Sequence, residues 1–252
     1  MSACDVNAEA LAASAVFPGD TVCVFGSTIS LLHTTCEPKE VEGFVSGYSL
    51  LRGTYRLGAA TSSGTRFLEK MDTYFGFEGY LDTKGKILPP TGLLIQPYID
   101  GARTPFDDPD ASGVIWGMNG NTKRDSFFLA SREALGYELA LLCHCIEQSG
   151  ESIKTLHCMG GLSGNRSVMQ IVADITGKQL YIHSGVDASY GDGILAMLAH
   201  HPVEESLHLA GYMKHYEQMQ RIEPDPESHR LYAPYVKKYL RMFPLMQELD
   251  DV

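Results

Sequence analysis

The sequence predicts an α/β fold in which β-strands alternate with helices. Segments rich in β-branched and aromatic residues alternate along the chain with segments whose apolar residues recur at helical spacing. In the middle of the chain, an apolar run from Ile153 to Met159 is followed by two glycines and then by a helical pattern that ends at Gly177. A strand, a glycine turn and a helix in this order are typical of α/β proteins.

Length and composition indicate a globular chain with one large domain, or one domain with an added excursion. The chain has 252 residues, of which 44% are hydrophobic and 20% are charged. Its formal net charge of −11 argues against nucleic acid or an anionic membrane as the main partner. A polyanionic ligand would have to be held locally, by backbone N–H groups, helix ends and a metal ion. The sequence has no apolar run near the roughly 20 residues of a spanning helix and no export signal, so we expect a cytoplasmic protein. It has no Cys-x-x-Cys spacing, so we expect no metal ion that is held by protein side chains.

The N-terminal part predicts a helix followed by a β-hairpin. Residues 5–15 are alanine-rich, and Asp5 stands where a helix N-cap belongs. The segments 21–25 and 29–35 have the composition of strands, and Gly26-Ser27-Thr28 separates them. Backbone amides and hydroxyls at such a tip can hold phosphate oxygens, although a turn without a ligand is the more frequent use of this composition.

The next part of the chain predicts a strand, a turn and a helix, followed by a loop-rich stretch. Residues 53–57 have strand composition, and Thr61-Ser62-Ser63-Gly64 forms the turn before the helix. Residues 73–112 are rich in glycine and proline and form an excursion from the domain, with a buried strand within 92–99. Residues 123–147 then predict a long amphipathic helix, because their apolar residues recur at helical spacing.

The central glycine segment allows two interpretations. Gly160 and Gly161 have no side chains, so the backbone there could approach a flat or charged ligand. Asn165 adds an amide, both donor and acceptor, where the helix begins. On spacing alone the simpler interpretation is a tight strand-to-helix connection that is capped by Ser163 or Asn165.

The C-terminal part predicts a strand and two helices. Residues 178–183 have strand composition, and a helix is expected to begin near Asp187. Further on, Tyr232, Tyr235 and Tyr239 are spaced at i, i+3 and i+7, which places them on one helical face. We expect this face to pack on the body of the domain.

Several of these motifs, in this order, resemble those of the FGGY family of carbohydrate kinases. The resemblance extends from about Cys4 to about Tyr239. It is carried by Asp5 with its helix, Gly26-Ser27-Thr28, Arg103-Thr104-Pro105, Gly160-Gly161-x-Ser163-x-Asn165, Ala173-Asp174-Ile175, Ala188-Ser189-Tyr190-Gly191 and Pro224-x-Pro226. The resemblance implies the actin-like ATPase, or ribonuclease-H-like, fold, in which a mixed β-sheet is flanked by helices. It further implies that residues 1–252 are a single C-terminal nucleotide-binding domain, and that the family's N-terminal sugar-binding domain is absent from this chain.

The resemblance also implies a role for each matched residue. Asp5 would remove the proton from the sugar hydroxyl. The hairpin residues Gly26, Ser27 and Thr28 would hold the phosphates of ATP together with Mg²⁺, and Gly64 would form a second wall of the nucleotide cleft. Gly160, Gly161 and Asn165 would hold adenine. Arg103 is expected to pin neighbouring loops through its forked donors. Cys4 stands where the family has glycine, and Ser27-Thr28 reverses the family's Thr-Ser order.

As a whole, the resemblance implies a kinase that transfers the γ-phosphate of ATP to a sugar hydroxyl. The acceptor is expected to be a ketopentose such as xylulose or ribulose, because the C-terminal Pro-x-Pro and tyrosine pattern resembles that of pentulose kinases. The missing N-terminal domain is the expected partner, in cis or in trans, and a homodimer is an expected assembly. The alternative is an actin-fold nucleotide-binding or regulatory module without turnover. Half of a Rossmann dehydrogenase is disfavoured, because no Gly-x-Gly-x-x-Gly follows the first strand.

Overall fold

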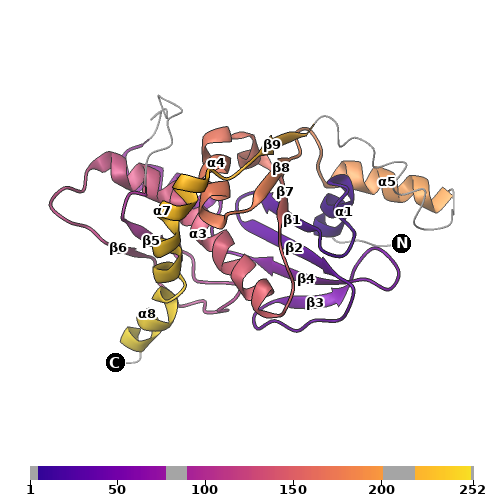
Figure 1. Ribbon diagram of the computed structural model, residues 1–252, viewed down its shortest axis with the longest axis horizontal. Helices are drawn as coiled ribbons and strands as arrows, with labels where there is room; N and C mark the ends of the chain where they lie inside the picture. The colour runs from indigo at the N-terminus through magenta and orange to yellow at the C-terminus, as the bar shows by residue number, and fades with distance from the viewer. Residues whose placement is uncertain (1–4, 78–89, 201–218, 251–252) are drawn as a thin grey trace.

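The computed structural model describes residues 5–77, 90–200 and 219–250, and it has a mixed α/β architecture (Figure 1). Cys4 and residues 78–89 of the predicted excursion lie outside the described residues. The strands are β1 (Thr21–Phe25), β2 (Ile29–Thr35), β3 (Val45–Tyr48), β4 (Tyr55–Ala60), β5 (Leu94–Gln96), β6 (Val114–Trp116), β7 (Thr155–Met159), β8 (Gln179–Ile182) and β9 (Gln220–Ile222). The helices are α1 (Asp5–Ala12), α2 (Thr65–Phe75), α3 (Arg124–Gln148), the 3₁₀ turn η1 (Gly161–Gly164), α4 (Arg166–Thr176), α5 (Ala188–His200), α7 (Pro226–Tyr239) and α8 (Met242–Asp250).

Within the described residues, seven strands form one sheet in the order β3-β4-β2-β1-β7-β8-β9, and β5 pairs with β6 apart from it. The sheet is mixed, as predicted, because β1 is antiparallel to β2 and parallel to β7. Strand β2 is antiparallel to both β1 and β4, and β7 is parallel to both β1 and β8. Strands β1, β4, β7 and β8 therefore point in the same direction, and their carboxyl ends share one edge of the sheet.

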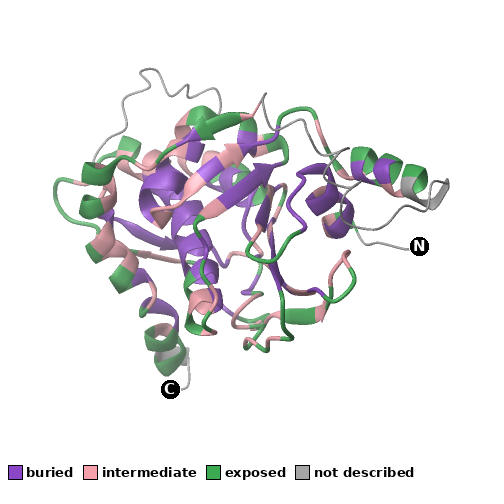
Figure 2. Ribbon diagram, turned by 45° about the vertical axis from the view of Figure 1, so that its right-hand side comes forward, coloured by how far each residue is buried: buried purple, intermediate pink, exposed green. Residues whose placement is uncertain are grey.

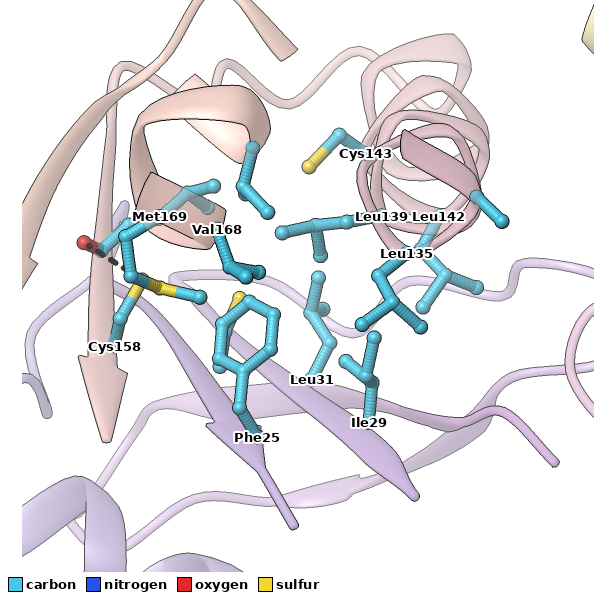
Figure 3. Close-up of a cluster of buried hydrophobic side chains, with 14 of the residues drawn as sticks. Phe25, Ile29, Leu31, Leu135, Leu139, Leu142, Cys143, Cys158, Val168 and Met169 are labelled. Carbon is cyan, nitrogen blue, oxygen red and sulfur yellow. Dashed lines mark hydrogen bonds between the residues drawn. The ribbon is translucent and has the colours of Figure 1, made fainter. Parts of the chain in front are cut away.

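The two faces of the sheet are covered by different helices, because successive strand residues point to opposite sides. Phe25 and Leu31 face α3 and α4, where they pack with residues such as Leu139 (Figure 3). Val22 and Leu32 face the other way and pack with α1 and α5. Buried residues are concentrated in the central strands and in the helices that lie against them (Figure 2). The resulting core fixes the shared carboxyl edge between two helical layers.

Helix α7 lies along α3 and α4 and is held by two buried tyrosines. Tyr232 and Tyr239 are buried and Tyr235 is half-buried, so the predicted packing of this face is confirmed. The Tyr232 hydroxyl donates to Glu133 at 2.9 Å, and the Tyr239 hydroxyl donates to Glu138 at 2.5 Å. Polar hydrogen bonds inside an apolar layer therefore set the register of α7 against α3.

The two glutamates on α3 are themselves buried titratable groups. Glu133 also accepts hydrogen bonds from the N–H and the hydroxyl of Thr91, at 3.1 Å and 2.6 Å. Glu138 accepts a second hydroxyl, from Tyr98, at 2.8 Å. Burial raises the pKa of each carboxyl to about 7, because the hydrogen bonds, which favour the charged form, offset only part of the desolvation.

These raised pKa values predict that stability falls as the pH rises from 6.5 to 8.5. Each carboxyl binds its proton more tightly in the folded chain than in the unfolded chain, whose pKa is near the ordinary 4.5. The stability that each carboxyl contributes by holding this proton is therefore fully present below pH 4.5 and is lost as the pH rises through 7. For Glu133 and Glu138 together, the free energy of unfolding should fall by about 1–2 kcal/mol over this window, as measured by urea unfolding.

The double change Glu133→Gln and Glu138→Gln should flatten this pH dependence, whereas the exposed control Glu69→Gln should leave it intact. The window begins at pH 6.5 because the buried His157 and His183 have lowered pKa values, near 4. These histidines change stability in the opposite direction, and they do so below pH 6.5. An unchanged slope in the double variant would contradict the assignment.

Candidate functional site

Four connections meet at the shared carboxyl end of β1, β4, β7 and β8, and we call this region the carboxyl edge. It consists of residues 26–28 after β1, 61–64 after β4, 160–165 after β7 and 183–187 after β8. Sheets of this type bind ligands at the carboxyl ends of their strands, where loops and helix starts converge. Seven of the eight predicted site residues, all except Asp5, lie in the first three connections.

The hairpin tip at residues 26–28 is held closely by the turn after β4. The N–H of Thr65 donates to the carbonyl of Gly26 at 2.9 Å, and the N–H of Ile29 donates to the carbonyl of Ser63 at 2.9 Å. A Cβ atom at Gly64 would lie 2.6 Å from the carbonyl oxygens of both Gly26 and Ser27. The structure therefore brings Gly64 against the hairpin tip, and only glycine fits at this contact.

The tip presents free hydrogen-bond donors. Ser27 is exposed, and Thr28 is half-exposed. Among the described residues, neither the N–H group nor the hydroxyl of Ser27 or Thr28 has a hydrogen-bond partner. Two amides and two hydroxyls at a rigid tip can together surround an anion, since successive backbone N–H groups form an anion-binding concavity.

The Gly160–Gly161 turn lies against the end of β1. Gly160 has φ of 92°, and a Cβ atom there would lie 2.6 Å from the carbonyl oxygen of Phe25. Position 160 thus requires glycine, both because of its positive φ and because of its close packing on Phe25. The carbonyl of Gly160 accepts from the Ser163 hydroxyl at 2.7 Å, which closes the turn. Gly161 is exposed, so the backbone at this point of the carboxyl edge is open to a ligand.

Asn165 is the N-cap of α4. Its Oδ1 accepts from the N–H of Val168 at 3.2 Å, so one of the two predicted capping residues is confirmed. The side chain is exposed, and among the described residues no partner is found for its Nδ2 donor. The two interpretations of the sequence are therefore compatible: the oxygen caps the helix while the nitrogen remains available to a ligand.

Asp5 begins α1, whose end leads through residues 13–20 to the start of β1. The helix therefore runs away from the carboxyl edge, and its first residue lies on the side of that edge. Asp5 is exposed, one turn before Glu9. Burial and then the charges of Asp5 and Asp187 raise the pKa of Glu9, which places the three carboxyl groups near one another. Asp187 belongs to the connection after β8, so Asp5 lies beside the carboxyl edge.

The contact between α1 and α5 is a feature that the sequence does not reveal. A Cβ atom at Gly191 would overlap the carbonyl oxygen of Ala8, so the two helices touch backbone to backbone. The motif Ala188-Ser189-Tyr190-Gly191 marks the glycine but does not indicate which element lies against it. Gly191 thus sets the position of the helix that begins with Asp5.

Arg103 does not have the structural role that we expected. Its side chain is exposed and makes no hydrogen bond or ion pair with any described residue. The next residue holds the loop instead. The N–H of Thr104 donates to the carbonyl of Ala60 at 3.2 Å, and the Thr104 hydroxyl accepts from the N–H of Ala60 at 3.3 Å. The prediction failed because a short hydroxyl next to the end of β4 reaches its backbone, whereas the long guanidinium extends into solvent.

Within the described ranges, no group of three or more His, Cys, Asp or Glu side chains could hold a metal ion. In the same ranges, no helix is both long enough and apolar enough to span a membrane.

The open hydrogen-bond donors at the carboxyl edge are the amides and hydroxyls of Ser27 and Thr28 and the side-chain amide of Asn165. Such donors suit a polyanionic ligand better than a metal bound by protein alone.

The mixed sheet and its glycine-lined carboxyl edge define an α/β domain of the ligand-binding type. The family profile described as the FGGY family of carbohydrate kinases, C-terminal domain, matches residues 21–200. The chain belongs to this family. The family resemblance noted in the sequence is thereby confirmed.

Characterised sugar kinases are similar to this chain in sequence. The chain is 27% identical to a ribulokinase of Bacillus licheniformis over 171 residues, which cover 64% of this chain and 30% of the relative. It is 28% identical to the xylulose kinase of Escherichia coli K12 over 156 residues, which cover 60% of this chain and 32% of the relative. The matched regions thus amount to about a third of each relative's length.

Solved structures share the fold. The match with the xylulose kinase from Rhodospirillum rubrum covers 98% of this chain and 51% of the kinase chain, with a TM-score of 0.84 and 20% identity. The match with the glycerol kinase of Plasmodium falciparum, solved with ADP, covers 95% of this chain and 51% of the kinase chain, with a TM-score of 0.72 and 18% identity. The predicted actin-like ATPase fold is therefore confirmed, and the chain spans about half the length of these structures.

Proposed function

We propose that this chain is the ATP-binding C-terminal half of a sugar kinase, which transfers the γ-phosphate of ATP to a hydroxyl of a ketopentose such as xylulose or ribulose. The observation that carries the proposal is the set of free amides and hydroxyls at Ser27 and Thr28, next to two turns that admit only glycine. Family membership and the ribulokinase and xylulose kinase relatives support the substrate class.

In this proposal the carboxyl edge binds ATP at two places. The tip Gly26, Ser27 and Thr28 would hold the phosphates, with Gly64 behind it, while Gly160, Gly161 and Asn165 would hold adenine. Glycine at positions 64 and 160 lets these two turns pack against the hairpin tip and the end of β1, which brings the open amides of the tip next to the exposed backbone of Gly161. The related glycerol kinase of Plasmodium falciparum was solved with ADP, which supports the same ligand class.

Asp5 is the proposed general base. Phosphoryl transfer requires positioning, charge neutralisation and a group that accepts the proton of the attacking hydroxyl. An exposed carboxylate at the start of α1, beside the carboxyl edge, can do this, and it favours a kinase over a nucleotide-binding module without turnover. Mg²⁺ would neutralise phosphate charge, and it would be held largely through the ATP phosphates with one or two carboxylates.

Domain organisation follows from the same proposal. Residues 1–252 would form one nucleotide-binding domain that works with an N-terminal sugar-binding domain, in cis or in trans, and the assembly would be a homodimer. Closure of the two domains on the substrates would exclude water, which competes with the sugar as phosphoryl acceptor. The five described cysteines are unpaired, which fits the reducing cytoplasm.

Calorimetric titration of Mg-ATP into this chain, repeated with xylulose and ribulose, tests the proposal. We expect saturable binding of Mg-ATP that is weakened by Ser27→Pro, which removes one of the free amides from the hairpin tip. Binding of neither nucleotide nor sugar by the full-length protein would contradict the proposed function. A phosphoryl-transfer assay with the same two sugars then decides between them as acceptors.

The adenine assignment predicts that Asn165→Ser raises the KM for ATP by about 2- to 10-fold and leaves the KM for sugar unchanged, since a hydrogen bond contributes about 0.5–1.5 kcal/mol net. Serine is as good an N-cap as asparagine but lacks the amide nitrogen. The melting temperature should therefore stay the same in Asn165→Ser and fall in Asn165→Ala, which loses the cap as well. Equal effects on both KM values would count against the assignment.

A further inference from the structure

A groove outside the carboxyl edge lies between the β5–β6 hairpin and the C-terminal helices. It has a volume of about 350 Å³ and is walled by Leu94, Trp116, Leu245 and Met246. Trp116 is 48% exposed and Leu245 is 46% exposed. Pockets for small organic ligands measure roughly 300–1,000 Å³, so this groove is at the lower end of that range. Contiguous apolar side chains that stay open to water mark a binding surface.

Two cations also line this groove. They are Lys238 on α7 and Arg241, which lies between α7 and α8. The Lys238 ammonium is 5.1 Å from the centroid of the Trp116 ring, which keeps it over the apolar wall. Among the described residues, neither cation forms an ion pair, whereas Arg132 and Lys178 are each paired with a carboxylate. In a chain of net charge −11, two unpaired cations beside an apolar groove indicate a site for an anion.

We propose that this groove binds a free amphiphilic organic anion with an unbranched apolar body and one carboxylate, such as a medium-chain fatty acid. The apolar body would cover Trp116, Leu245 and Met246 and release water from them. The carboxylate would lie between Lys238 and Arg241, where a guanidinium can bind both of its oxygens. A groove of about 350 Å³ fits a small molecule rather than a membrane surface. None of the residues of the carboxyl edge takes part.

The single tryptophan of the chain makes the test direct, because Trp116 alone reports on the groove. Octanoate should shift the Trp116 emission to shorter wavelength in a saturable manner, below its micelle concentration. The double variant Lys238→Gln and Arg241→Gln should raise the dissociation constant at least 10-fold. The matched control Lys70→Gln removes an exposed lysine on α2 and should change nothing. Unaltered circular dichroism would show that the variants fold.

Two further ligands, one without a charge and one with a short apolar body, separate the contribution of the carboxylate to binding from that of the apolar contact. Octanol should bind at least 10-fold more weakly than octanoate, and acetate should produce no saturable shift. Equal binding of octanol and octanoate would overturn the proposal, because the cations would then be irrelevant. An unchanged dissociation constant in the double variant would do the same, as would a Trp116 emission that does not respond to octanoate.

Discussion

Replacing Asp5 with asparagine in the full-length protein should lower kcat for the proposed sugar phosphorylation by about 10²–10⁴-fold, since an amide cannot accept the proton of the sugar hydroxyl. The KM for ATP should change little, because the nucleotide contacts lie on the hairpin tip and the Gly160–Gly161 turn. Stability should also change little, since Asp5 is exposed and a carboxylate in the first turn of a helix contributes only about 0.3–1 kcal/mol through the helix dipole. Steady-state kinetics with saturating sugar measures the effect.

The neighbouring carboxylate provides the matched control. Glu9 is one helical turn from Asp5, and burial raises its pKa together with the charges of Asp5 and Asp187. Glu9→Gln removes a carboxylate of the same helix and should reduce kcat far less than Asp5→Asn. If Glu9→Gln abolished turnover while Asp5→Asn remained active, the general base would be Glu9 and the assignment of Asp5 would be wrong.

The substitution Gly191→Ala should produce the largest structural effect, because its Cβ atom would overlap a carbonyl oxygen of α1. The clash is with the backbone of Ala8, so no side-chain rotation relieves it. Overpacking of this kind costs about 1–3 kcal/mol, and α1 must move away from α5. Since Asp5 begins α1, kcat should fall together with the melting temperature in the full-length protein.

Gly193→Ala is the control on the same helix. Gly193 is exposed, and a Cβ atom there would meet nothing within 4 Å. Alanine favours a helix over glycine by about 1 kcal/mol, so this variant should be at least as stable as the parent. Equal melting temperatures for Gly191→Ala and Gly193→Ala would show that the close contact with α1 is absent in solution.

The elements and several site residues were predictable because their signals are local. A glycine that needs positive φ, as Gly160 does, lies where a strand changes to a helix, and that change is visible in the spacing of apolar residues. The N-cap at Asn165 was one of two candidates for the same reason. The two hydroxyls of the hairpin tip were likewise marked by composition alone, although their freedom from internal hydrogen bonds was not.

Contacts between distant segments required the tertiary structure. Nothing near Glu133 or Glu138 in the sequence indicates that tyrosines about 100 residues later donate to them. Arg103 was expected to hold its loop, but Thr104 does so, because only the folded chain shows which side chain reaches Ala60. These outcomes depend on distances of a few ångströms between elements, and a linear pattern does not contain them.

The sequence by itself therefore determined the fold class, the order of the elements and the glycine turns of the carboxyl edge. The tertiary structure decided that α1 and α5 touch through Gly191, that two carboxyls are buried under α7, and that Trp116 and two cations line a groove. The physical reason is the range of the interactions. Backbone preference and apolar periodicity act over a few residues, whereas packing and electrostatics join residues that only folding brings together.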